Sequence, residues 1–318
     1  MKLLAFFDPH VDVRGPINRT DEFEETCFNK LEEVGAIAYK RGCSYILCSG
    51  DFFNRKGALV PHRLIARSAD CLKSFKVPFL TISGNHDQFG GDPETIMSQP
   101  LGVLSRAAGF KILGKTSVEQ LDEDVFLTAL PYYSGIDTHL EDYLPNRPEK
   151  AKIHIHLTHG SLMPKKPVWE PYTLYSQLVG CKADFVLNGH LHDGYPTEKV
   201  GNVTIVNPGS LTRGALTESN INRQVGVVLI DTDTKGVEFI PLKSALPASK
   251  CFNLEGNTET KLAEEAITML GALIRHESGN VELSGPESIR HLVKELKTIK
   301  EPVRTKIFTL LDKAEESI

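Results

Sequence analysis

The sequence predicts an α/β protein with one larger domain followed by a small module. Short apolar runs rich in Val, Ile, Leu and Phe recur along most of the 318 residues, and stretches with apolar side chains at helical spacing separate them. Runs of this kind are typical of buried strands that helices cover. After Pro247 the pattern changes. We therefore expect a main domain at residues 1–247 and a small C-terminal α/β cap or partner-binding module at residues 248–318.

Strands are expected where the apolar runs are rich in β-branched and aromatic residues. They are residues 2–7, 45–49, 79–83, 125–129, 153–158, 185–188 and 203–206. Helical spacing of apolar residues predicts one helix within residues 21–41 and a second helix after Pro61. Residues 224–242 alternate around a turn rich in Asp, Thr and Gly, which predicts a β-hairpin.

The C-terminal module combines shorter elements. We expect a short strand near Cys251, a helix at about residues 261–275, a strand at residues 280–283 and then further helices. Near the end of the chain, apolar residues at helical spacing form one stripe: Ile289, Leu292, Val293, Leu296 and Ile299. Such a stripe is typical of an amphipathic helix that packs on one side.

Composition and charge limit the possible partners. The formal net charge is −5, so the chain lacks the basic character of a protein that coats nucleic acid, and any contact with DNA would be local. The six cysteines form no C-x-x-C pair, and the apolar run at residues 3–7 is too short for a signal peptide. No apolar stretch approaches the roughly 18 residues that span a bilayer. We expect a cytoplasmic protein with free thiols and no membrane partner.

Possible metal ligands occur in five short clusters at the ends of apolar runs: Asp8-Pro9-His10, Gly50-Asp51, Gly84-Asn85-His86-Asp87, His159-Gly160 and Gly189-His190-Leu191-His192. In an extended chain residues i and i+2 point the same way, so Asp8 and His10 can face one ion. Mixed carboxylate, amide and imidazole ligands suit manganese, iron or zinc. The glycines allow tight turns beside the ligands. Together the clusters predict a two-metal site that hydrolyses a phosphate ester.

The order of these clusters, followed by Asn207-Pro208-Gly209-Ser210, resembles the calcineurin-like metallophosphoesterase superfamily over roughly residues 1–245. The resemblance implies a four-layer αββα sandwich, in which two mixed sheets pack face to face with helices outside, and a small C-terminal α/β cap. Within the superfamily, the long insertion after His10 at residues 16–23, together with Asp51-Phe52-Phe53, looks most like SbcD-type DNA repair exonuclease subunits.

The resemblance also implies roles for individual residues. One ion would be held by Asp8, His10, Asp51 and His192, and the other by Asp51, Asn85, His159 and His190. Asp51 would thus bridge two divalent ions, manganese in the first place and iron or zinc as alternatives. A hydroxide bound by the ions would attack phosphorus. His86 would be catalytic, either stabilising charge on the phosphoryl group or protonating the departing sugar oxygen.

Two more residues of the motifs are expected to act on substrate or on the ligands. Asp87 would orient His86 or a nearby ligand. The common family motif Gly-Asp-x-x-Asp ends here with Asn54. An amide cannot act as acid or base, but it can hydrogen-bond a ligand or a phosphate oxygen, so the role of Asn54 stays open.

Several side chains have both a functional and a structural interpretation. His154 and His156 share one face of the strand expected at residues 153–158 and are interpreted as ordinary strand positions. Basic residues either contact phosphates or form solvated surfaces: Arg55-Lys56 with Arg63 and Arg67, and Lys165-Lys166. Aromatic residues of one Pro-rich loop either stack on bases or pack against the domain: Trp169, Tyr172 and Tyr175.

Three functions follow from these patterns. The first is a manganese-dependent nuclease on DNA, acting alone or with an SbcC-like SMC-type ATPase, and the insertion after His10 and the C-terminal module favour it. The second is a small-molecule phosphodiesterase or phosphomonoesterase for cyclic or bis-nucleotides, which the acidic net charge favours. The third is a non-catalytic scaffold, against which the complete ligand set argues. A second copy of the chain, giving a homodimer, is a further possible partner.

Overall fold

The computed structural model of the chain describes residues 1–16, 18–168, 170–254, 266–270, 286–296 and 299–315. Contacts within the chain divide it into two compact units. The first comprises Met1–Lys166 and Tyr172–Phe252, and the second comprises Pro167–Pro171 and Asn253–Ile318. All five ligand clusters fall in the first unit.

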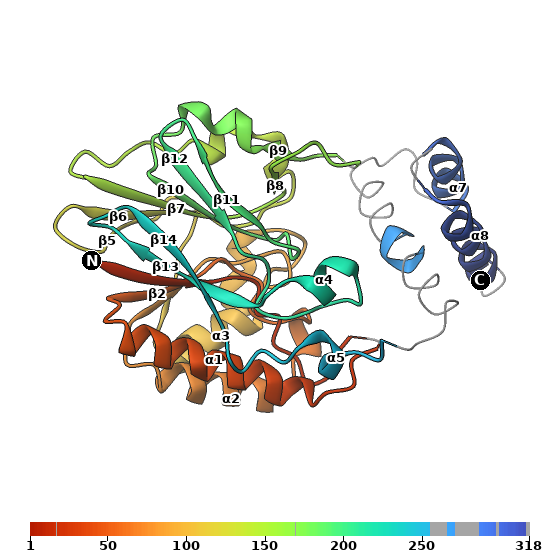
Figure 1. Cartoon of the computed structure of the whole chain (residues 1–318), viewed down its shortest axis with the longest axis horizontal. Coiled ribbons are helices and arrows are strands. Elements are labelled where there is room, and N and C mark those ends of the chain that lie inside the picture. The colour runs from red at the N-terminus through yellow and green to blue at the C-terminus, as the bar shows by residue number, and fades with distance from the viewer. Residues whose placement is uncertain (17, 169, 255–265, 271–285, 297–298, 316–318) are drawn as a thin grey trace. The chain divides into compact units, whose positions relative to one another are not determined.

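A six-stranded sheet with the order β14-β13-β1-β2-β3-β4 forms one half of the first unit. Its parallel part is β1 (Lys2–Phe6), β2 (Tyr45–Cys48), β3 (Phe79–Thr81) and β4 (Lys111–Ile112). The hairpin of β13 (Gly226–Asp231) and β14 (Gly236–Pro241) extends it, because β13 pairs antiparallel with β1. The helices α1 (Phe23–Lys40), α2 (His62–Lys73) and α3 (Pro100–Ala108) cover its outer face (Figure 1).

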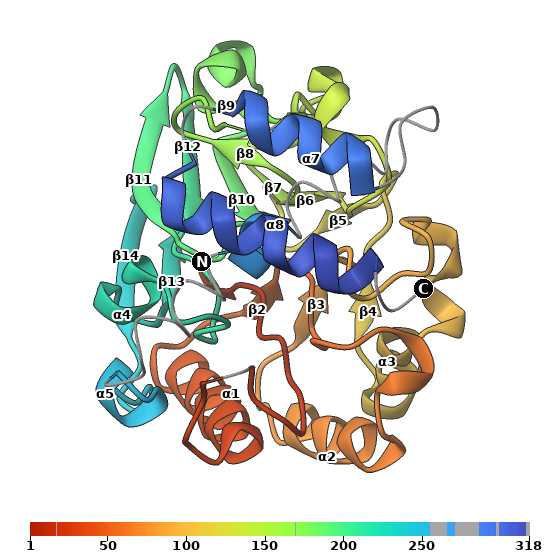
Figure 2. The ribbon, with the colours of Figure 1, turned by 90° about the vertical axis from the view of Figure 1, so that its right-hand side faces the viewer.

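A second six-stranded sheet packs against the first, and both can be followed in Figure 2. Its parallel centre is β12 (Val203–Asn207), β10 (Phe185–Gly189), β7 (Ile153–His159) and β6 (Val125–Leu130). The antiparallel strands β11 (Tyr195–Val200) and β5 (Val118–Gln120) form its edges. The outer face is covered by short 3-10 helices: η3 (Ile136–Thr138), η4 (Leu140–Tyr143) and η5 (Tyr175–Gly180). The predicted sandwich of two sheets and helices is therefore confirmed.

The core of this unit follows from the two-residue period of its strands. Leu3 and Ala5 of β1 point to the second sheet and join a cluster with Leu157 of β7, whereas Leu4 and Phe6 point to the helices. All of these side chains are at most 1% exposed. Because both faces of the central strands are buried, these strands appear in the sequence as continuous apolar runs.

Leu157→Ala tests the inter-sheet core. Leu157 is fully buried between the sheets, so we expect the truncation to lower the free energy of unfolding by about 2–5 kcal/mol, from lost burial and the cavity left behind. Urea unfolding measures this change. The exposed Val118 of β5 is the control, and its change to alanine should cost less than about 0.5 kcal/mol. Equal losses in both variants would contradict the assignment of Leu157 to the core.

Two cationic side chains bind main-chain carbonyls of the loop that follows β12. The main-chain carbonyls of Ser210 and Thr212 accept from Arg223 (2.8 and 2.7 Å). The carbonyl between them, that of Leu211, accepts from Lys30 Nζ of α1 (2.7 Å). Lys30 is only 3% exposed, and this burial lowers the pKa of Lys30 to about 8.

The lowered pKa of Lys30 predicts a pH dependence of stability. Between about pH 8 and 10.5 the folded protein has lost this proton while the unfolded chain still carries it, so stability rises with pH across that window. Relative to Lys30→Met, which does not titrate, the wild type should gain on the order of 3 kcal/mol from pH 7.5 to 10.5. Chemical denaturation of both proteins across this range measures the difference, and a constant difference would contradict it.

Several elements differ from the sequence-based expectation. Residues 248–251, near which a short strand was predicted, form one helical turn, α5 (Ala248–Cys251), so that prediction is wrong. Two further features were not predicted. One is a separate two-stranded sheet of β8 (Leu162–Met163) and β9 (Thr173–Leu174), and the other is the short helix α4 (Glu218–Asn222). The same holds for α3, β4, β5 and β11.

The described residues of the second unit from residue 266 onward are mainly helical. Residues 266–270, α7 (Pro286–Glu295) and α8 (Glu301–Glu315) share one apolar cluster, which includes Val293 and Ile307. The strand predicted at residues 280–283, most of the helix predicted at residues 261–275, and Trp169 lie outside the described residues. Across the described parts of both units, no helix is long and apolar enough to cross a membrane.

Candidate metal centre

The ligand clusters meet at one edge of the two facing sheets. Asp8 follows β1, Asp51 follows β2 and Asn85 follows β3, while His159 ends β7 and His190 follows β10. Because these strands are parallel within each sheet, their carboxyl ends lie at the same edge. Each cluster therefore lies at, or shortly after, the carboxyl end of its strand.

The backbone at these residues is unusual. Asp8, His10, Asp51 and His190 all have positive φ, at 43°, 44°, 50° and 81°. Non-glycine residues rarely adopt this conformation, and where they do the surrounding structure must enforce it. At two of them the enforcement is visible, because His10 N donates to Asp51 O (3.1 Å) and the next pair, Val11 N and Phe52 O, are 2.8 Å apart. The first two motifs therefore continue to pair beyond the ends of their strands.

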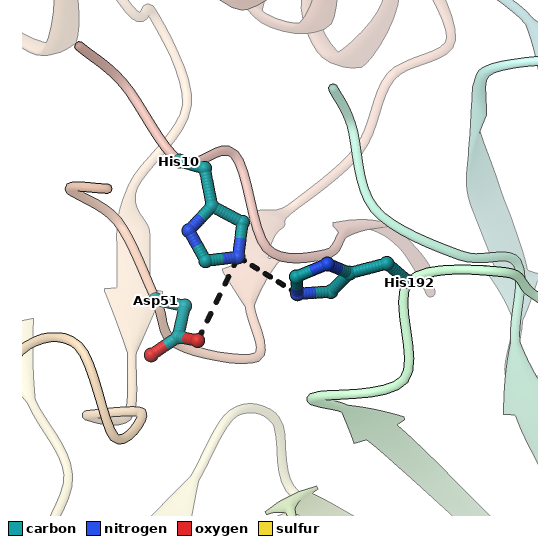
Figure 3. A group of neighbouring side chains, drawn as sticks. All are labelled: His10, Asp51 and His192. Atoms are coloured by element: carbon teal, nitrogen blue, oxygen red, sulfur yellow. Dashed lines mark hydrogen bonds and ion pairs between the residues drawn. The ribbon is translucent and has the colours of Figure 1, made fainter. Parts of the chain in front are cut away.

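One group of candidate ligands consists of His10, Asp51 and His192 (Figure 3). The Nε2 atoms of the two histidines lie 2.8 Å apart, and His10 Nε2 lies 3.7 Å from Asp51 Oδ2. Two imidazole nitrogens at this distance need a shared proton or a cation between or beside them. Their rings meet nearly edge to face, at 70°.

A second group shares the same carboxylate oxygen. Asp51 Oδ2 lies 3.5 Å from His159 Nε2, and His190 completes the group. Asn85 Oδ1 lies 3.2 Å from His159 Nε2 and 3.0 Å from His190 Nδ1, so the amide oxygen faces both imidazoles. His159 Nδ1 donates to the carbonyl of Ser49 (2.7 Å), which leaves Nε2 directed at the group.

Asp8 is held differently from the other predicted ligands. Its two carboxylate oxygens accept the main-chain N–H of His190 (3.1 and 3.0 Å), and Oδ1 lies 3.5 Å from His159 Nδ1. It lies outside both groups of converging ligand atoms. The structure therefore shows Asp8 beside the two groups, where its carboxylate holds the loop that begins at His190.

Burial and mutual charge set the protonation of this cluster. Burial, together with repulsion from Asp51, raises the pKa of Asp8 to about 7 and that of Asp87 to about 7. Burial would also raise the pKa of Asp51, but His159 and neighbouring imidazoles hold it well below its usual value. Conversely, burial alone would lower the pKa of His159, but the negative charge of Asp51 raises it to about 9. His159 therefore carries one positive charge beside the shared carboxylate.

The other imidazoles are kept neutral. Burial, with repulsion from the charged His159, lowers the pKa of His190 to about 3. Burial likewise lowers the pKa of His192 to about 4 and that of His10 well below its ordinary value. Neutral imidazole is the form that binds a metal ion. The buried carboxylate of Asp51 and the neutral imidazoles of His10, His190 and His192 form a donor set that divalent ions fit.

Two glycines confirm how tightly this space is formed. A Cβ added at Gly84 would lie 2.1 Å from Asp51 Oδ1, and one at Gly189 would lie 2.9 Å from Asp8 Oδ1. Any side chain at these positions would displace a carboxylate. The donor set and the cleared space therefore fit a pair of metal ions.

Comparison with known proteins agrees with this geometry. The family model described as calcineurin-like phosphoesterase matches residues 1–194, which is more than half of the 318 residues. The chain belongs to the calcineurin-like phosphoesterase family. Calcineurin-like phosphoesterases hydrolyse phosphate esters and use two divalent metal ions, so the predicted reaction class and number of ions are confirmed at this level.

Solved structures similar to this calcineurin-like phosphoesterase include TT1561 of Thermus thermophilus, at 13% identity and a TM-score of 0.47, covering 76% of this chain and 98% of that one. They also include the sulfate thiohydrolase SoxB of Thermus thermophilus in complex with glycerol, at 14% identity and a TM-score of 0.47, covering 77% of this chain and 57% of that one. At such identities a likeness concerns the fold alone. No curated protein matches the chain.

The remaining predicted site residues of this calcineurin-like phosphoesterase lie around the two ligand groups. Asp87 accepts the main-chain N–H groups of Phe52 (3.1 Å) and Gly84 (2.9 Å), so its carboxylate ties together the loops that carry Asp51 and Asn85. The main-chain N–H of His86 donates to Asp51 Oδ1 (2.7 Å). The ring of His86 packs edge to face on that of His10, at 4.8 Å between centroids.

Two buried histidines of β7 have a structural role in this calcineurin-like phosphoesterase. His154 Nε2 and His156 Nδ1 both contact Thr128 Oγ1 (2.8 Å each). Burial lowers the pKa of His154 to about 4 and that of His156 to about 3, so both are neutral. Their interpretation as ordinary strand positions is confirmed.

Sequence reasoning missed two residues that help to shape the site of this calcineurin-like phosphoesterase. Asp12, two residues after His10, hydrogen-bonds the side chains of Asn54 and Arg55. The ring of Tyr132 lies 5.9 Å from that of His190. Asp12 continues the i, i+2 spacing of Asp8 and His10, which is a signal that could have singled it out; Tyr132 follows a strand end without any motif.

Proposed function

We propose that this protein is a two-metal-dependent phosphodiesterase and, within that class, a DNA nuclease similar to SbcD-type exonuclease subunits. The observation that carries the proposal is the position of Asp51, whose Oδ2 faces His10 at 3.7 Å and His159 at 3.5 Å. A carboxylate shared between two ligand groups suits a two-ion site for phosphoryl chemistry. The long insertion after His10 and the additional C-terminal unit support the narrower assignment to DNA.

The proposed ligands keep the sets that the family resemblance implies: Asp8, His10, Asp51 and His192 for one ion, and Asp51, Asn85, His159 and His190 for the other. Mixed oxygen and imidazole ligands favour manganese, with iron and zinc as alternatives. When bound, the ions would supply a hydroxide nucleophile and neutralise charge on the phosphoryl oxygens. His86 would act on the substrate directly, because its Nδ1 donates to the Asn54 carbonyl (2.5 Å) and its Nε2 has no hydrogen bond to any residue that the structure describes.

The insertion after His10 is an anchored part of the domain, which supports a role in shaping the approach to the site. Arg19 lies between the rings of Phe23 (4.9 Å) and Phe252 (5.3 Å) and pairs with Asp21 (2.6 Å). Thr20 N donates to Cys251 O (2.9 Å). The insertion is thereby fixed to the last residues of the first unit.

One observation favours a small-molecule substrate as the second candidate. The basic residues that follow Asp51 in the sequence form ion pairs with carboxylates: Arg55 with Asp12, Arg63 with Glu24, and Arg67 with Glu24 and Glu25. Paired cations contribute less to binding a phosphate backbone than unpaired ones do. Hydrolysis of cyclic or bis-nucleotides would need fewer such contacts.

A manganese-supplemented assay of four substrates tests the proposal: duplex DNA, single-stranded DNA, cyclic nucleotides and bis-p-nitrophenyl phosphate. The nuclease assignment predicts cleavage of DNA and of the chromogenic diester, with no activity after chelation. Cleavage of nucleotides and the chromogenic diester without DNA would favour the second candidate. Absence of turnover on all four, with metals bound, would contradict the phosphodiesterase itself.

Lys56→Ala tests contact with the DNA backbone. Lys56 is exposed and lies two residues after Asn54. If it contacts a phosphate, its removal should weaken binding of every DNA sequence alike and reduce the slope of log K against log salt by about 1. Fluorescence anisotropy over a potassium chloride series measures the slope. Lys150→Ala, an exposed lysine before β7, is the control, and an unchanged slope in both would contradict the contact.

A further inference from the structure

His86 is held through its side-chain Nδ1 by a single neighbour. Nδ1 lies 2.5 Å from the main-chain oxygen of Asn54, and since a carbonyl only accepts, Nδ1 carries the proton. No described carboxylate or side-chain amide shares this contact. The direction of the imidazole therefore depends on where the carbonyl of Asn54 points.

That carbonyl belongs to the peptide unit joining Asn54 to Arg55, and one buried carboxylate holds both of these residues. Asp12 Oδ2 accepts from Asn54 Nδ2 (3.0 Å) and from Arg55 Nε (2.9 Å). Asp12 is 1% exposed, and its other oxygen accepts the N–H of Val13 (2.7 Å). Asn54 is fixed from a third side, because its own N–H donates to Val11 O (3.1 Å).

This arrangement defines a clamp, consisting of Asp12, Asn54 and Arg55. Side chains on either side of one peptide unit bind the same oxygen atom, so the unit cannot rotate without breaking one of these bonds. Of the two hydrogen bonds to Asp12 Oδ2, the one from Arg55 is of the stronger type, because its donor is charged. The side chain of Asn54 faces the clamp, and only its main chain faces His86.

We propose that Asp12 is a positioning residue, which sets the direction of the His86 imidazole by clamping the Asn54–Arg55 peptide unit. The inference rests on the proposed function in that His86 is taken to act on the phosphodiester. Asp12 itself belongs to neither group of candidate ligands. Its removal frees the peptide unit, lets the carbonyl turn away and leaves the imidazole without its one fixed acceptor.

A double-mutant cycle separates this role from a general effect on the insertion. The protein, loaded with manganese, is assayed on bis-p-nitrophenyl phosphate as wild type, Asp12→Ala, His86→Ala and the double variant. A catalytic group displaced by about 1 Å can lose on the order of 100-fold in rate, so we expect Asp12→Ala to lower kcat by about 10- to 100-fold. KM and manganese content should stay unchanged. In the His86→Ala background Asp12→Ala should lower kcat no further.

Equal factors in both backgrounds would overturn the proposal, because the effect of Asp12 would then bypass His86. Loss of manganese in Asp12→Ala would overturn it as well. Asp12→Asn keeps an acceptor oxygen and should restore most of the rate. Asp184→Ala is the matched control, since Asp184 also accepts from an arginine and a main-chain N–H but lies before β10, at the opposite end of the strand from His190.

A second measurement does not depend on activity. Imidazole nitrogen NMR of the metal-free protein at one fixed pH should show His86 with Nδ1 protonated in the wild type and a changed tautomer signal in Asp12→Ala. If Asp12→Ala does not fold, Asn54→Ala and Arg55→Ala each remove one of the two hydrogen bonds to Asp12 Oδ2 instead. An unchanged signal in folded variants overturns the clamp. A wild type without phosphodiesterase activity would overturn the proposed function, while this signal still decides the clamp.

Discussion

Replacing Asp51 with alanine is expected to remove both metal ions at once. Among the described residues, Asp51 is the one carboxylate that belongs both to the group with His10 and His192 and to the group with His159 and His190, and its Oδ2 faces both groups. The variant should lose phosphodiesterase activity by more than about 100-fold, the upper range for residues that only support a ligand. Elemental analysis and manganese calorimetry give the stoichiometry, and the wild type should bind two ions.

The control for this variant is another largely buried carboxylate. Asp184 pairs with Arg147 and Lys235 at the far end of β10, so Asp184→Ala should keep both ions and most of the activity even if it unfolds more easily. Retention of two ions at wild-type affinity in Asp51→Ala would contradict a shared ligand. Retention of one ion would show that the two groups do not share this carboxylate equally.

His86→Ala is expected to lower turnover strongly while leaving the metal content intact. The side chain of His86 belongs to neither ligand group, yet its ring lies 4.8 Å from that of His10. A positioned imidazole contributes about 10²- to 10⁴-fold in kcat. Steady-state kinetics on bis-p-nitrophenyl phosphate and on DNA, together with manganese content, measure the two properties separately.

A histidine away from the site provides the comparison. The side chain of His139 is about half exposed and pairs with Glu141 at the surface, so His139→Ala should keep wild-type kcat. Turnover of His86→Ala at the wild-type rate would show that His86 has no part in the reaction. Loss of an ion in His86→Ala would instead make His86 a ligand.

Much of the fold and the ligand set could be predicted because the signals are local. Continuous apolar runs identify strands buried on both faces, and β1, β2 and β10 lie where such runs occur. Parallel strands bring their carboxyl ends together, so polar residues at those ends had to meet. By contrast, β11 is mostly exposed and reads as a polar segment, and β4 has only two residues.

The contacts that orient the site could not be predicted in the same way. Asp8 and Asp87 bind main-chain N–H groups, and His86 and His159 donate to main-chain carbonyls. Every residue type except proline offers both groups, so the sequence does not indicate where such contacts form. The role of Asn54 illustrates this point, because the atom that meets His86 is its carbonyl oxygen.

Four site residues have positive φ angles, and this limits how the protein can evolve: Asp8, His10, Asp51 and His190. Each such conformation costs of order 1–3 kcal/mol in a non-glycine residue. Glycine would relax the backbone at any of them and at the same time erase a ligand. Selection for thermal stability therefore favours glycine at these four positions, whereas selection for turnover favours the ligand. A screen that selects only for thermal stability would enrich inactive variants.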